Sequence, residues 1–121
     1  MLLITTGRKS GKKRFTMVDV LIYERESDTY FIEVGFGKRS DWYQNIQVNP
    51  LFEAQVGHRR FHAMVEELPS DKASDMMVQF LRRRPLYSKS VMKAAGITFT
   101  TEGELRELTT QMILLAVHPQ K

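Results

Sequence analysis

The chain has 121 residues, of which 42% are hydrophobic and 26% charged, with a net charge of +4 and no cysteine. This length suits one domain and the apolar content can bury a core, so we expect a single globular domain over residues 1–121. The absence of cysteine excludes disulfides, thiol nucleophiles and cysteine-ligated metals. The first residues carry no basic leader region, and no apolar run is long enough to span a bilayer, so we expect a cytoplasmic protein.

Three apolar segments at the start of the chain predict strands before the first helix. The second of them, residues 14–23, is apolar on both faces, which favours a central position in a sheet. A short helix follows, which Ser40 or Asp41 can cap, with Gln44 in the place that a capping box requires. The three strands are residues 2–6, 14–23 and 30–34.

The second half of the chain predicts a hairpin, three helices and a last strand. Gly57-His58 is the expected hairpin turn. The helix with the clearest apolar period ends near the basic run at residues 82–84, whose charges complement the helix dipole. Because helices and strands do not alternate as βαβ units, we expect an α+β, mainly β fold: an antiparallel sheet or small barrel with peripheral helices. These elements are strands at 52–56, 60–66 and 112–117 and helices near 73–81, 85–96 and 101–108.

Two cation-rich loops bounded by glycine are the candidate binding sites. The first spans residues 5–12 and contains Arg8, Lys9 and Ser10 between two strands. Backbone N–H groups, hydroxyls and cations in such a turn can cradle a phosphate or carboxylate, although the spacing is not that of a P-loop. A plain solvated turn is the alternative.

The second loop precedes the first predicted helix, whose N–H groups can also hold an anion. Its candidate cofactor-binding residues are Gly35, Gly37, Lys38, Arg39, Ser40 and Trp42. A simple strand–helix turn explains the loop equally well. The presence of both loops in one small domain favours a single anionic ligand that contacts both.

Other groupings of reactive side chains are less specific. Asp19 interrupts an apolar face and Glu33 lies on the neighbouring predicted strand, so the two carboxyls either form a pair with raised pKa, line a solvated edge or meet an arginine. His58 and His62 are too far apart on a strand to share an ion, and we expect no metal site. The basic loops lack a base-reading motif, so we expect no nucleic-acid partner.

Three motifs, in this order and spacing, resemble the deazaflavin-dependent nitroreductase family. They are TTGRKSGK at residues 5–12, DWYQNI at 41–46 followed by NP at 49–50, and QVG at 55–57. The resemblance covers residues 2–66 well and the remainder only in the order of its elements. It implies a split β-barrel of the flavin-reductase or FMN-binding type, which is often dimeric.

The resemblance also implies a coenzyme and an activity. Members bind the 8-hydroxy-5-deazaflavin coenzyme F420 and transfer a hydride to a small electrophile such as a nitro compound, quinone or activated alkene. By position, Arg8, Lys9 and Ser10 would contact the phosphate and acidic tail. The loop from Gly35 to Arg39 and the helix start from Ser40 to Trp42 would lie beside the coenzyme. The candidate catalytic residues, for proton supply or substrate orientation, are Tyr43 and Tyr87.

Some positions depart from the family pattern. Lys13 and Met17 stand where proline is usual, and the loop before Trp42 is short. Two alternatives to the deazaflavin-dependent oxidoreductase therefore stay open: an FMN-dependent reductase, and a protein that binds a flavin or another anionic ligand without turnover. We further expect a homodimer whose interface helps to form the site, with the last strand, 112–117, as the segment that most needs cover.

Overall fold

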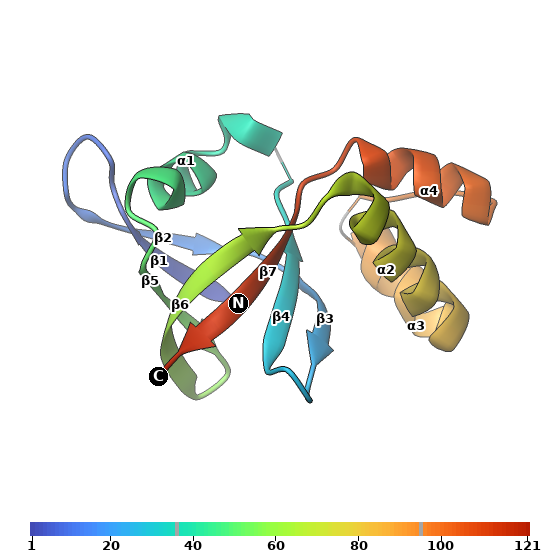
Figure 1. Cartoon of the computed structure of the whole chain (residues 1–121), viewed down its shortest axis with the longest axis horizontal. Helices are drawn as coiled ribbons and strands as arrows, with labels where there is room; N and C mark the ends of the chain where they lie inside the picture. The colour runs from blue at the N-terminus through green and yellow to red at the C-terminus, as the bar shows by residue number, and fades with distance from the viewer. Residues whose placement is uncertain (36, 95) are drawn as a thin grey trace.

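A computed structural model of the protein describes residues 1–35, 37–94 and 96–121. The described strands form one antiparallel sheet in the order β2-β1-β5-β6-β7-β4-β3, with the helices beside it (Figure 1). This arrangement confirms the predicted α+β, mainly β class. The strands are β1 (Leu2–Thr6), β2 (Lys13–Met17), β3 (Val20–Glu24), β4 (Thr29–Glu33), β5 (Phe52–Val56), β6 (Arg59–Glu67) and β7 (Leu114–Gln120). The helices are η1 (Gly37–Arg39), α1 (Asp41–Val48), α2 (Ser70–Arg83), α3 (Pro85–Ala94) and α4 (Glu102–Thr110).

The segment predicted as one central strand, residues 14–23, is two strands at opposite edges of the sheet. Val18-Asp19 separates β2 from β3. The prediction of a central strand was therefore wrong, because apolar residues on both faces do not require a neighbour on both sides. On β2 they are solvent-exposed instead, with 65% of Phe15 and 72% of Met17 accessible.

The short link between β2 and β3 determines the shape of the sheet. Strands at the two ends of the sheet order are separated by two residues only, so the sheet has to curl until its edges approach each other. Met1 and Val18 exchange backbone hydrogen bonds of 2.8 and 2.9 Å at this point. Among the described residues β2 does not pair with β3, so the curled sheet stays open along a seam.

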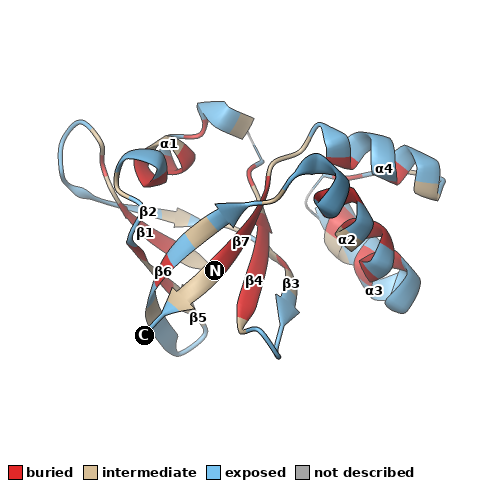
Figure 2. Cartoon of the chain, viewed as in Figure 1, coloured by how far each residue is buried: buried red, intermediate tan, exposed pale blue. Residues whose placement is uncertain are grey.

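Two apolar cores lie on the two faces of the curled sheet (Figure 2). The inner core gathers Leu3, Ile32 and Trp42 inside the curl, where α1 covers one end. The outer core lies between the sheet and the helices α2 to α4, and it includes Met77 and Leu105. Helix α1 lies on the side of the molecule away from these three helices, whereas β3, which borders the seam, packs Leu21 against them (Figure 1).

The last strand occupies the interior of the sheet rather than an open edge. β7 lies between β6 and β4, and Leu114, Leu115 and Val117 are at most 1% exposed. Leu115 and Val117 contribute to the inner core and Leu114 to the outer core. The expectation that this strand needs cover by a second subunit was wrong, because its uniform apolar character serves two cores of the same chain.

The predicted hairpin and helices are present with small shifts at their ends. Gly57 adopts a φ of 58° in the turn between β5 and β6, where glycine is favoured. Thr101 caps α4 by accepting a hydrogen bond from the Glu104 N–H at 3.1 Å. No helix in the described parts of the chain has the length and apolar character needed to cross a membrane.

Candidate functional site

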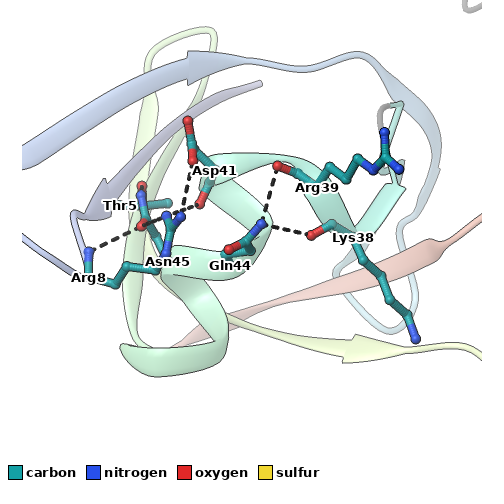
Figure 3. Close-up of polar contacts among 7 residues, drawn as sticks. All are labelled: Thr5, Arg8, Lys38, Arg39, Asp41, Gln44 and Asn45. Atoms are coloured by element: carbon teal, nitrogen blue, oxygen red, sulfur yellow. Dashed lines mark hydrogen bonds and ion pairs between the residues drawn. The ribbon is translucent and has the colours of Figure 1, made fainter.

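Arg8 fixes the β1–β2 loop against helix α1 (Figure 3). Its guanidinium donates to the Asn45 Oδ1 at 2.9 Å and forms an ion pair with Asp41 at 3.2 Å. Its backbone N–H donates to the same Asn45 oxygen at 3.1 Å. The buried Asn45 amide also reaches the buried hydroxyl of Thr5 at 3.5 Å. Two segments that are more than 30 residues apart in sequence are therefore held as one rigid unit.

The start of α1 is built differently from the predicted capping box. The Gln44 side chain donates to the carbonyls of Lys38 and Arg39, at 3.0 and 3.3 Å, rather than to the helix cap (Figure 3). The Ser40 hydroxyl, at the N-cap position, makes no side-chain capping bond. It is buried, and among the described residues it has no hydrogen-bond partner. The capping-box prediction was wrong, and a buried hydroxyl is left available to a ligand.

A cationic groove of about 640 Å³ lies over the β1–β2 loop and α1. Arg8, Lys9, Lys13 and Arg14 contribute four cations to its lining, against the single carboxylate of Asp41. Because Arg8 is already paired with Asp41, the other three are the cations that can face a ligand. Its other lining residues are Gly7, Ser10, Phe15, Thr16, Trp42 and Asn45.

A second groove, of about 690 Å³, follows the open seam between β2 and β3; we call it the seam groove. Its floor and walls are largely apolar, with Met17 exposed on one side. Ser40, Asp19 and Glu33 supply polar groups. The remaining lining residues are Met1, Thr16, Val18, Val20, Leu21, Gly35, Asp41, Trp42 and Val56.

The two grooves share a wall. Thr16, Asp41 and Trp42 line both of them, so a ligand with an anionic tail and a flat apolar ring can occupy both at once. Trp42 is 9% exposed and is held by the inner core, which gives this wall a fixed position.

Glu33 has an unusual environment for a carboxylic acid. It ends β4 and is half-buried in the seam groove, and burial raises its pKa above the ordinary value. The structure also brings Asp19 to this groove, so the two carboxyls singled out in the sequence do share a site.

Part of the second predicted loop lies away from both grooves. Gly37, Lys38 and Arg39 line neither of them. Gly37 has a φ of 61°, and a Cβ there would meet open space. The glycine is therefore needed for this backbone conformation and not for a close contact with a ligand. Gly35 does line the seam groove, and a Cβ at Gly35 would also meet nothing within 4 Å.

The two candidate tyrosines are separated from these grooves. The Tyr43 hydroxyl donates to Glu67 at 2.6 Å, and this hydrogen bond, together with burial, raises the pKa of Tyr43 to about 12. Tyr87 lies on α3, where it lines a different groove, between β3 and α2, and packs edge-on against Phe80. The structure brings together Arg8, Lys9, Ser10, Gly35, Ser40 and Trp42, but neither tyrosine joins them.

Several residues that line these grooves were not among the site residues predicted from the sequence. Lys13 and Arg14 extend the cationic lining onto β2, and Phe15 and Met17 add exposed apolar surface beside it. The run of basic residues from position 8 to 14 carried a signal for the first pair. Phe15 and Met17 resemble core residues in the sequence, and their exposure follows only from the position of β2 at the edge of the sheet.

A model of the F420H(2)-dependent quinone reductase family matches residues 1–101, most of the chain. The chain belongs to this family. The match confirms the deazaflavin-dependent resemblance of the motifs at residues 5–12 and 41–57.

Relatives of this family member include the F420H(2)-dependent quinone reductases of two Mycobacterium tuberculosis strains, CDC 1551 and H37Rv. Each is 39% identical over 64 residues, which make up 50% of this chain and 41% of the relative. The chain thus spans less than half the length of these relatives. A solved structure with 12% sequence identity matches with a TM-score of 0.52 over 98% of this chain and 71% of its own, which supports the fold.

Proposed function

We propose that this chain binds coenzyme F420 and uses its reduced form to transfer a hydride to a quinone-type acceptor. The observation that carries the proposal is the pair of contiguous grooves, one cationic and one largely apolar, that share Asp41 and Trp42. Such a pair suits an elongated ligand with an acidic tail and a flat ring. Membership of a family named for F420H(2)-dependent quinone reduction indicates which ligand this is.

The residues present fit the coenzyme at both ends. Lys9, Lys13 and Arg14 would hold the phosphate and acidic tail in the cationic groove, because charge-assisted hydrogen bonds are the stronger kind. The buried Ser40 hydroxyl, which has no hydrogen-bond partner among the described residues, can satisfy a polar edge of the ring in the seam groove. Gly35 leaves room there for the ring to approach the backbone.

The chemistry divides between coenzyme and protein. When bound, the reduced deazaflavin supplies the hydride. The chain's own residues bind and orient: Arg8 holds the tail-binding loop against α1, and Trp42 forms the shared wall. The seam groove excludes part of the bulk water from the reacting centre through its apolar lining, which strengthens polar interactions there.

We also propose a homodimer in which a second copy covers the β2 edge. Phe15 and Met17 are exposed along this strand and line the two grooves, so a partner seated there would complete the site. In this view the curled sheet corresponds to the split β-barrel that the resemblance implies.

Binding and turnover are tested with purified protein. We expect fluorescence titration to show tighter binding of oxidised F420 than of FMN, and the absorbance of reduced F420 to decay faster with a quinone when the protein is present. Preferred binding of FMN with flavin-dependent turnover would instead support the FMN-dependent alternative. Tight F420 binding with no acceleration by quinones, nitroaromatics or activated alkenes would support a binding protein without turnover.

A further inference from the structure

Glu33 occupies a position from which it can act on a molecule in the seam groove. It is the last residue of β4, where its backbone pairs with Leu114 of β7. This pairing fixes the Cα on the rigid sheet, while the half-buried side chain lines the groove together with Ser40 and Trp42. A group on a sheet strand is held more accurately than one on a loop.

The surroundings of Glu33 favour its protonated form. No ion pair or hydrogen bond to its carboxyl occurs among the described residues, and no lysine or arginine lines the seam groove there. The charged groups around the groove are the carboxyls of Asp19 and Asp41 and the amino group of Met1, which donates to the Val18 carbonyl. Burial raises the pKa of Glu33, so this carboxyl keeps its proton to a higher pH than a carboxyl in water does.

Quinone reduction creates a need for such a proton. The quinone accepts a hydride with its electron pair, is thereby reduced to the hydroquinone monoanion, and requires one proton to become the hydroquinone. Tyr43 is bound to Glu67, and Tyr87 lies in another groove, so neither is placed to supply it.

We infer that Glu33 is the general acid that protonates the reduced acceptor in the seam groove. This inference rests on the proposed function. The O–H bond of the Glu33 carboxyl breaks and a new O–H bond forms on the anionic oxygen of the acceptor. The coenzyme, which has given up the hydride, is the group oxidised. The Glu33 carboxylate is then reprotonated from solvent, which reaches the groove through its open side. The proton that the coenzyme loses on oxidation returns to the solvent, so the overall reaction is balanced.

The decisive variant is Glu33→Gln, which keeps the shape of the side chain and removes its acidic proton. Glu26→Gln, in the exposed β3–β4 turn, is the matched control for loss of one carboxyl. Each protein is loaded with reduced F420 and given one of two acceptors. One is a benzoquinone, which needs a hydride and a proton. The other is the N-methylphenazinium cation, which becomes neutral on accepting a hydride and needs no proton.

We expect Glu33→Gln to slow quinone reduction by about 100-fold, within the usual range for loss of a general acid, and to leave phenazinium reduction within about twofold of wild type. Wild-type quinone reduction should also decrease as pH rises through the raised pKa of Glu33, whereas the variant should lack this decrease. Equal slowing with both acceptors would overturn the inference in favour of a positioning or packing role, and unchanged quinone reduction would overturn it outright.

A measurement without coenzyme tests the same carboxyl. A carboxyl whose folded-state pKa is raised loses stability as pH rises through that pKa, so Glu33→Gln should melt at a higher temperature than wild type at pH 8 but not at pH 4. Melting profiles that parallel those of Glu26→Gln at every pH would contradict the protonated carboxyl.

If wild type oxidises reduced F420 with neither acceptor, the proposed function fails and the inference with it. Turnover by wild type with no specific effect of Glu33→Gln overturns the inference alone.

Discussion

At the scale of single residues, the cations of the first loop have different roles. The Arg8 side chain is 22% exposed and is bound to Asn45 and Asp41, whereas Lys9 is exposed and lines the cationic groove. From the sequence, Arg8 and Lys9 are equivalent candidates for binding the anionic tail. The structure assigns Arg8 to holding the loop and leaves Lys9 available to the ligand.

We expect Arg8→Ala to lower the free energy of unfolding by about 1–3 kcal/mol, because the charge-assisted hydrogen bond to Asn45 and the ion pair with Asp41 are lost, and only the backbone N–H of residue 8 still donates to Asn45. Lys9→Ala, the control, should unfold like wild type but bind F420 more weakly. Urea denaturation and fluorescence titration measure the two effects. If Arg8→Ala unfolds at the wild-type urea concentration, the anchoring role is wrong.

The glycine that a ring would approach is Gly35. Its backbone does not require glycine, since its φ is not positive, and a new side chain would project into open space in the seam groove. We therefore expect Gly35→Val to reduce F420 affinity at least tenfold with little change in melting temperature, and Gly35→Ala to have a smaller effect. Titration of both variants against oxidised F420 checks this. Wild-type affinity in Gly35→Val would exclude the seam groove as the ring site.

At the scale of elements, an ion pair joins two hairpin turns across one end of the curled sheet. Asp28, in the β3–β4 turn, accepts two hydrogen bonds of 2.7 Å from Arg59 at the start of β6. Arg59 also donates to the Tyr30 hydroxyl and stacks over Phe61. Asp28 has a φ of 52°, a conformation that asparagine also tolerates.

This ion pair predicts a specific pH dependence of stability. Hydrogen bonds from Arg59, and then from Tyr23, lower the pKa of Asp28 to about 2. The stabilisation is therefore complete above the unfolded-state pKa of about 3.9 and is lost as pH falls towards the folded-state value. We expect wild type to melt above Asp28→Asn at pH 6 and the difference to shrink between about pH 4 and pH 2. A constant difference across this range in calorimetry would contradict the prediction; Glu26→Gln is the control in the same turn.

At the scale of the whole molecule, the open seam and the exposed β2 edge are the features that a second copy would cover. Exposed edge strands with large apolar side chains are unusual in stable monomers. Because Phe15 and Met17 are already in solvent, changing both to serine should leave the fold intact.

We expect light scattering to give twice the chain mass of 14.1 kDa for wild type and a shift towards the monomer for the Phe15→Ser, Met17→Ser double variant. The variant should also bind F420 more weakly, since the partner helps to close the grooves. Leu86→Ser and Tyr87→Ser, exposed on α3 and lining neither the cationic groove nor the seam groove, form the matched control. A monomeric wild type, with or without F420, would rule out the proposed dimer.

The sequence by itself determined most elements and the chemical nature of the site. The apolar period of α2, the glycine turn at Gly57 and the Thr101 cap are local features. Each depends on residues a few positions apart, so the sequence predicted each of them correctly. The cationic loop and the family motifs likewise depend on residues that are close in sequence.

Only the tertiary structure decided which residues share a groove. A break at Val18-Asp19 places the two halves of one apolar run at opposite sheet edges, and Phe15 and Met17 are exposed on the β2 edge. The curl then brings Glu33 and Ser40 together, while Tyr43 turns to Glu67. An apolar residue looks the same in a core and on an exposed edge, because burial depends on partners that are distant in sequence. For this reason the sequence predicted an anionic ligand, and the fold determined which side chains line the grooves proposed to hold it.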